Sequence, residues 1–145
     1  MREILFRGKD KNTNEWSYGS LMCFHGYQIY DNTRVSWVSV RGETVGQYTG
    51  LTDTNGKKIF EGDVLKYTRT KWNEPLHSDN GKDIVSFHEI YFDENEGSLK
   101  QKHYTDKGNL IASGYMFSFI DVRADENKIE VIGNIYDNPE LLEEK

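Results

Sequence analysis

Short apolar runs, separated by glycine and by Asn- and Asp-rich turns, are the feature that most constrains how this chain folds. The 145 residues include 13 glycines and only 2 prolines. Short runs of β-branched and aromatic residues bounded by turn residues are typical of strands. The sequence therefore predicts a mostly β protein, a single compact antiparallel domain over residues 1–145 with a barrel-like or strongly twisted sheet.

Two turns and the C-terminal tail give the sharpest local predictions. Asn55–Gly56 predicts a tight hairpin turn with Gly56 at positive φ. A second reversal at residues 61–63 is similar, by fold analogy, to the opening of small SH3-like barrels, so an SH3-like core is possible. Asn138 and Pro139 predict the start of a short C-terminal helix. Strands are expected at residues 2–7, 16–25, 27–30, 34–40, 57–60, 64–67, 84–87, 90–92, 115–122 and 129–136, with 132–136 in a central strand that shares one core with residues 59–65.

Composition places the chain among folded proteins of a reducing compartment. Aromatic residues make up 13% of the chain, which argues against disorder. The one cysteine, Cys23, can form no internal disulfide, and the N-terminus lacks the apolar run of a signal peptide. No stretch approaches the roughly 20 apolar residues that cross a bilayer. We therefore expect a protein of the cytoplasm that does not bind membranes.

Net charge bears on the class of partner. The 18 Lys and Arg against 24 Asp and Glu give a formal charge of -6. A negative protein repels phosphate backbones at long range, so a broad nucleic-acid surface is disfavoured. One segment nevertheless interleaves cations with aromatic rings, as single-stranded nucleic acid binding requires. The candidate residues are Lys66, Tyr67, Arg69, Lys71 and Trp72. In a strand their side chains would alternate between two faces, and a solvated edge strand explains the same residues.

Catalytic and metal-binding patterns are weak throughout the sequence. No two of the four histidines have zinc-site spacing, and the Asp-rich segments at 53–56 and 93–97 lack the twelfth-position glutamate of a calcium loop, so they predict turns. No phosphate-binding glycine motif is present. Cys23 and His25 would share a strand face without a third orienting group. Glu61, Asp63 and His88 are the residues that an unrecognised active site would bring together. No catalytic, cofactor or metal site is predicted.

Three blocks of the sequence resemble the YopX family of bacteriophage and prophage proteins. The first block, at residues 1–8, opens the chain, and Asp10 and Trp16 follow it. The blocks are MREILFRG at residues 1–8, QYTGLTDTNGKKIFEGDVL at 47–65 and VIGNIYDNPEL at 131–141. The resemblance implies a phage or prophage accessory protein and brings no established biochemical activity with it.

These observations lead to three functional hypotheses. The first is a non-enzymatic module in the host bacterial cytoplasm that binds a host or phage macromolecule, as a homo-oligomer and without a cofactor. The second is a single-stranded nucleic-acid-binding protein, and the third is an enzyme with an unrecognised site. Tyrosines and tryptophans are numerous for a short β-rich chain, and this favours self-association through sheet edges or aromatic surface.

Overall fold

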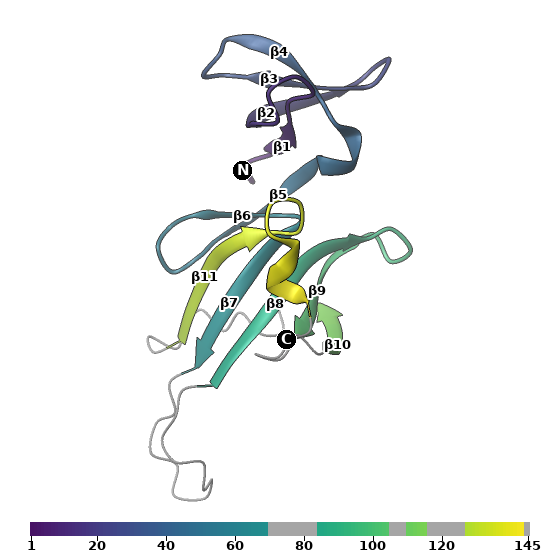
Figure 1. Cartoon of the computed structure of the whole chain (residues 1–145). Helices are drawn as coiled ribbons and strands as arrows, with labels where there is room; N and C mark the ends of the chain where they lie inside the picture. Colours follow the sequence, from purple (N-terminus) through teal and green to yellow (C-terminus); the bar gives the residue numbers. More distant parts are fainter. Residues whose placement is uncertain (70–83, 105–109, 116–126, 144–145) are drawn as a thin grey trace, which may run out of the picture. The chain divides into compact units, whose positions relative to one another are not determined.

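Two antiparallel sheets make up the described part of the protein. The computed structural model describes residues 1–69, 84–104, 110–115 and 127–143 (Figure 1). In these ranges one sheet has six strands and the other five, and the only helical segments are 3-10 turns. The mostly β, antiparallel prediction is confirmed. By its contacts the chain divides into unit 1 (Met1–Leu51 and Lys58–Glu61) and unit 2 (Thr52–Lys57 and Gly62–Lys145).

Unit 1 holds the six-stranded sheet, in the order β4-β3-β2-β1-β5-β6. Aspartates form its first and third turns: Asp10 Oδ1 accepts the amide of Asn12 at 2.8 Å, and Asp31 Oδ1 accepts that of Thr33 at 2.9 Å. Such Asx turns reverse the chain with a local side-chain acceptor. The strands are β1 (Phe6–Lys9), β2 (Trp16–Cys23), β3 (Tyr27–Asp31), β4 (Ser36–Val40), β5 (Gly46–Thr52) and β6 (Lys58–Phe60).

The sheet of unit 1 curls until its fourth strand meets the end of its first. Asp10 bridges Val40, and the Lys11 amide donates to the Ser39 carbonyl at 3.0 Å. The barrel-like prediction is therefore confirmed for this unit. The interior is a small apolar core of Ile29, Val38 and Val40, packed against Phe6, Leu21 and Val45.

Unit 2 holds the five-stranded sheet, in the order β10-β9-β8-β7-β11. Two expected strands at 84–87 and 90–92 are one continuous strand, because the two intervening residues, His88 and Glu89, also pair with β7 and are buried. The expected strand at 115–122 lies almost wholly outside the described residues. The strands are β7 (Asp63–Arg69), β8 (Ile84–Asp93), β9 (Ser98–Tyr104), β10 (Leu110–Tyr115) and β11 (Asn127–Asn134).

The central-strand prediction for residues 132–136 is wrong. β11 ends at Asn134 and is an edge strand of the described sheet, although it does pair with β7 as expected, Val131 opposite Leu65. The shared core is also divided, since Ile59 lies in unit 1 and Leu65 in unit 2. Gly62 separates these two segments at a φ of 82°.

The C-terminal helix prediction is also corrected. Residues Pro139–Leu142 form a 3-10 turn, η3, and Asn138 makes no side-chain capping bond. Four residues form too few hydrogen bonds to propagate an α-helix. No helix of the described residues is long and apolar enough to span a membrane.

Candidate binding surface

The basic and aromatic segment predicted from sequence is split between two faces of β7. The Tyr67 ring meets the His88 ring edge-on, with centroids 6.2 Å apart. Lys66 directly precedes Tyr67 in the strand and lies opposite Phe87. Because neighbouring residues of a strand point to opposite faces, the Lys66 side chain is on the other face. Arg69 ends β7, and Lys71 and Trp72 lie outside the described residues. Nucleic-acid binding by this segment stays a prediction.

The structure places the three residues of the enzyme hypothesis in different surroundings. Glu61 lies in unit 1, where its Oε2 accepts the Gln47 amide at 2.6 Å, and burial raises the pKa of its carboxyl. Asp63 begins β7 of unit 2, and His88 lies in the middle of β8. The Glu61 carboxylate is thus engaged by the backbone of its own unit.

A histidine pair that the sequence analysis did not detect lies within the five-stranded sheet. The rings of His88 and His103 stack with centroids 4.5 Å apart, because β8 and β9 place the two residues opposite each other. Ser86 Oγ lies 2.8 Å from His88 Nε2. Burial and the neighbouring His103 lower the pKa of His88 to about 4. A buried Ser–His pair with so weak a base is poorly suited to nucleophilic catalysis, which needs a base with a pKa near the working pH.

We expected Cys23 and His25 to share a strand face, and they do not. β2 ends at Cys23, and His25 lies in the following turn at a φ of 51°. Its ring packs edge-on against the neighbouring Phe24, with centroids 4.3 Å apart. His25 therefore lies outside the strand that holds Cys23.

The polar residues of the second family-like block bond to backbone groups. Asp53 Oδ1 accepts the amides of Asn55 and Lys57 at 2.9 and 2.8 Å, and its Oδ2 accepts that of Val131 at 3.0 Å. Gly56 has a φ of 82°, which confirms the predicted turn. Asp53 is only 7% exposed, so its carboxylate organises the backbone around it.

The third block has the same structural role. Asn134 Oδ1 accepts the amides of Tyr136 and Asp137 at 3.0 and 2.9 Å. Gly62, at the end of the second block, donates to the Ile90 carbonyl at 2.7 Å and accepts the Ile135 amide at 2.9 Å. The blocks that carry the family resemblance thus fix turns and strand ends.

The second calcium-like segment is a turn as well. Asp93 Oδ1 accepts the amides of Asn95 and Glu96, at 2.9 and 3.2 Å, and its Oδ2 pairs with Lys100 Nζ at 2.8 Å. A lysine in this position occupies the oxygen that a cation would need. In the residues that the structure describes, no three His, Cys, Asp or Glu side chains are placed to hold a metal ion.

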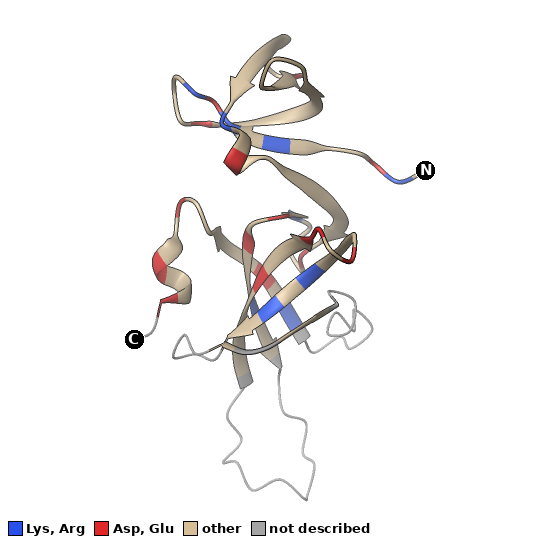
Figure 2. Ribbon diagram, turned by 90° about the vertical axis from the view of Figure 1, so that its right-hand side faces the viewer, with Lys and Arg blue, Asp and Glu red and all other residues tan. Residues whose placement is uncertain are grey.

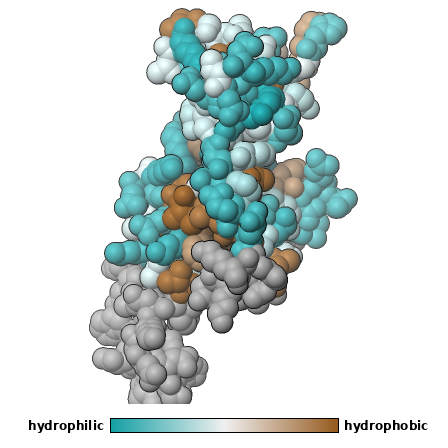
Figure 3. Space-filling model, viewed as in Figure 1, coloured by the Kyte–Doolittle hydropathy of each residue, from teal (hydrophilic) through white to brown (hydrophobic). Residues whose placement is uncertain are grey.

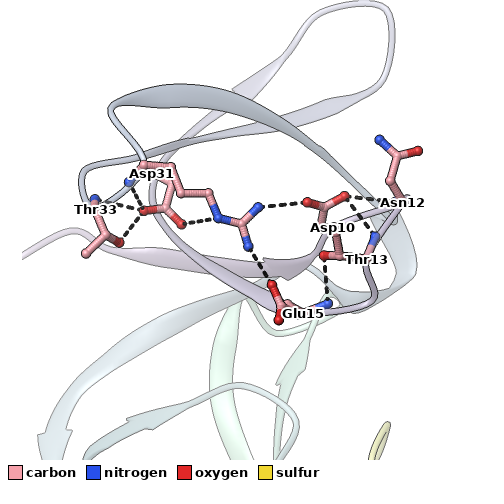
Figure 4. A network of polar contacts seen from close by, with 7 residues as sticks. Asp10, Asn12, Thr13, Glu15, Asp31 and Thr33 are labelled. Carbon is pink, nitrogen blue, oxygen red and sulfur yellow. Dashed lines mark hydrogen bonds and ion pairs between the residues drawn. The ribbon is translucent and has the colours of Figure 1, made fainter.

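An arginine network joins two turns of unit 1 (Figure 4). The Arg34 guanidinium lies 2.8 Å from Asp10, 3.2 Å from Glu15 and 3.8 Å from Asp31. The hydrogen bond from the Asn12 amide lowers the pKa of the Asp10 carboxyl most, and the hydrogen bond from Arg34 lowers it further. Three carboxylates around one cation leave this arginine well occupied, so the network stabilises the turns.

Cations near Trp16 are buried rather than presented to a ligand. The Arg7 guanidinium lies 4.5 Å from the Trp16 ring centre and 4.9 Å from that of Phe60, and it donates to the Glu61 carbonyl at 3.1 Å. Lys9 Nζ lies 5.2 Å from the Trp16 ring. Both cations are 5% exposed. They stabilise the sheet through cation–π contacts and offer little surface to a phosphate.

The outer face of β2, β3 and β4 carries exposed aromatic side chains. The strand register puts Tyr30 beside Ser20 and Trp37, while Ile29 and Val38 point to the opposite, buried face. The Tyr30 and Trp37 rings meet edge-on at 5.3 Å. We call the outward residues of these strands the aromatic face: Tyr18, Ser20, Met22, Gln28, Tyr30, Trp37 and Ser39.

The aromatic face is both open and uncharged. Trp37 is 49% exposed and Tyr18 is 43% exposed. None of its residues carries a formal charge. In Figure 3 the part of the molecule that holds β2, β3 and β4 is mostly pale or teal, with brown in few places. The sequence signal that was missed is the alternation, in adjacent predicted strands, of outward Tyr and Trp with inward Ile and Val.

Comparisons with known proteins identify the family. A crystal structure of protein EF1440 from Enterococcus faecalis is similar, with a TM-score of 0.52 and 22% identity over 99% of this chain and 100% of that one, which shows a common fold. Curated proteins give no match. A sequence profile described as YopX protein matches residues 5–143. The match covers nearly the whole chain, and the protein belongs to the YopX family.

Proposed function

We propose that this protein is a non-enzymatic binding module that uses the aromatic face of unit 1 to bind another protein. The observation that carries the proposal is a set of exposed, uncharged aromatic side chains on the outside of a closed sheet. Centres of protein interfaces are depleted in charge and enriched in Tyr, Trp and Met. Tyr and Trp also supply much of the binding energy at low entropic cost.

The family resemblance supports a phage or prophage context. On this proposal the partner is a host or phage protein, met in the cytoplasm of the bacterial cell. None of the residues of the aromatic face is a cation. This favours a protein over a nucleic acid, because binding a phosphate backbone requires exposed Lys and Arg.

Affinity capture with matched variants tests the proposal. Trp37→Ser removes the most exposed ring of the face, and Phe92→Ser removes a ring of similar exposure, 47%, from β8 of unit 2. We expect partners captured from the bacterial lysate by the native chain to be lost with Trp37→Ser and kept with Phe92→Ser. Mass spectrometry with isotope-labelled baits measures the difference. Equal recovery with both variants would contradict the proposal.

Oligonucleotide titration separates the nucleic-acid alternative. The proposal predicts no salt-dependent change in tryptophan fluorescence when a single-stranded oligonucleotide is added. Tight binding that weakens steeply with salt, and that survives Trp37→Ser but not Lys66→Ala, would favour the segment at 66–72 instead.

A further inference from the structure

In the described part of the chain, the outer edge of β11 is covered by a turn and not by a strand. β7 pairs with one side of β11, which is an edge strand of the described sheet (Figure 1). On the other side the Thr54 amide donates to the Ile129 carbonyl at 2.9 Å. The Ile129 amide donates to Thr54 Oγ1 at 2.8 Å, and the Val131 amide donates to Asp53 Oδ2 at 3.0 Å.

Two side-chain oxygens thus occupy positions that carbonyls of a neighbouring strand would take. Strand partners contact alternate residues of an edge, here Ile129 and Val131. A strand edge left open is a template for pairing with another chain. We call residues Asp53 and Thr54 the covering turn. Among the residues that the structure describes, it contacts the edge through one backbone and two side-chain hydrogen bonds.

We propose that the outer edge of β11 is a self-pairing site for a second copy of this chain, and that the covering turn keeps the site closed. A second copy is indicated because the strand is complementary to itself. Its sequence around Ile129 reads Asn-Lys-Ile-Glu-Val, with a cation and an anion on either side of one central residue.

The register of this pairing follows from the backbone. Ile129 and Val131 direct their amides to the outer edge, so they would form the hydrogen-bonded pairs of an antiparallel ladder. A ladder centred on Ile129 of both copies then sets Lys128 of each copy opposite Glu130 of the other. These are non-hydrogen-bonded positions, where side chains approach most closely, and opposite charges there are stabilising.

Opening the covering turn tests the proposal. The double variant Asp53→Ala/Thr54→Val removes both acceptor oxygens. Asp93→Ala is the control, since it removes a turn carboxylate that bonds to no neighbouring edge strand. In sedimentation equilibrium we expect the double variant to dimerise at least about tenfold more tightly than the native chain and the control. Unchanged association of a folded double variant would overturn the proposal.

Charge exchange tests the register. In the opened background, Glu130→Lys sets lysine opposite lysine and should weaken dimerisation by about tenfold. Adding Lys128→Glu restores opposite charges, and the affinity should return. If the dimerisation affinity of the charge-exchanged variant does not recover, the proposed register is wrong.

A peptide probe covers the case in which the double variant does not fold. Thr54→Val alone removes one acceptor, and a fluorescent peptide of residues 127–133 supplies the strand of the second copy. Anisotropy should show binding to Thr54→Val at least about fivefold tighter than to the native chain, weakened by lysine at the glutamate position of the peptide. No binding, or binding insensitive to that charge, would overturn the self-pairing site.

Discussion

The six-stranded sheet of unit 1 and the five-stranded sheet of unit 2 differ in charge and in what they expose. Unit 1 holds 7 of the 18 Lys and Arg and 6 of the 24 Asp and Glu, a net charge of +1, so unit 2 carries -7. Figure 2 marks the charged residues of the described segments. Among the described residues, exposed large hydrophobic side chains are more numerous in unit 1 than in unit 2, which has Phe92 and Leu110.

The difference also extends to the buried polar groups. Unit 1 buries the cations Arg7 and Lys9 against aromatic rings. Unit 2 instead buries three carboxylates, those of Asp53, Asp63 and Glu89. Among the described residues the buried cations lie in unit 1, which also exposes the rings of Tyr18 and Trp37. Similar strand-and-turn segments thus produce a candidate binding face in one unit and, in the other, a unit whose net negative charge lies outside its strands.

Core truncation in each unit should have the largest effect. Ile29 and Ile90 are both fully buried, so changing either to Ala should cost about 2–5 kcal/mol of unfolding free energy. In a Trp72→Phe background the tryptophans are Trp16 and Trp37 of unit 1. We expect Ile29→Ala to shift the fluorescence-detected urea transition more than Ile90→Ala does. Equal shifts would show that the two units unfold as one.

Acid should destabilise unit 2 through its histidine pair. The pKa of His88 falls from 6.5 to about 4 in the folded protein, so the fold favours the neutral ring. The contribution of neutral His88 to the free energy of unfolding is complete above pH 6.5. It is lost as the pH falls from 6.5 toward 4, and the loss reaches up to about 3 kcal/mol. Urea midpoints at pH 7, 5.5 and 4.5 measure the loss. His88→Gln should flatten this dependence and His25→Gln should not; the reverse result would refute the assignment.

Two glycines with the same backbone angle should respond differently to alanine. Gly62 and Gly56 both have a φ of 82°, but an added Cβ at Gly62 would lie 2.9 Å from Tyr136 Cε2, and nothing lies within 4 Å at Gly56. Gly56→Ala should cost about 1–2 kcal/mol in backbone strain, and Gly62→Ala at least about 1 kcal/mol more. Thermal melts compare the variants. Equal costs would mean that the tyrosine ring moves aside freely.

The smallest effect on stability is expected at the aromatic face. Trp37 is half exposed and packs mainly against Tyr30, so Trp37→Ser should change the unfolding free energy by no more than about 1 kcal/mol. Chemical denaturation measures this change. A loss as large as that of Ile29→Ala would show that the ring belongs to the core and that unit 1 has no separate binding face.

Much of the local structure could be predicted from the sequence, because it depends on neighbouring residues. The Asp53–Gly56 turn, the strands β3 and β4 and the alternation that separates Lys66 from Tyr67 are all local properties. The short C-terminal helix failed because whether four residues form an α-turn or a 3-10 turn depends on what they pack against.

The candidate surface was not predicted, because it depends on strand register. Tyr30 and Trp37 meet only when β3 and β4 pair as they do, and the same is true of His88 and His103 in β8 and β9. A shift of one residue would move every one of these side chains to the other face. Sequence patterns of single strands do not specify such cross-strand neighbours.

The antiparallel β class, the positions of the main turns and membership of the YopX family follow from the sequence alone. Turn preference and side-chain alternation depend on residues close together in the chain. The tertiary structure decided that Asp53 bonds to the edge of β11, that His88 stacks on His103 and that Trp37 faces outward. These contacts join residues far apart in the chain, so only the pairing of whole strands could fix them.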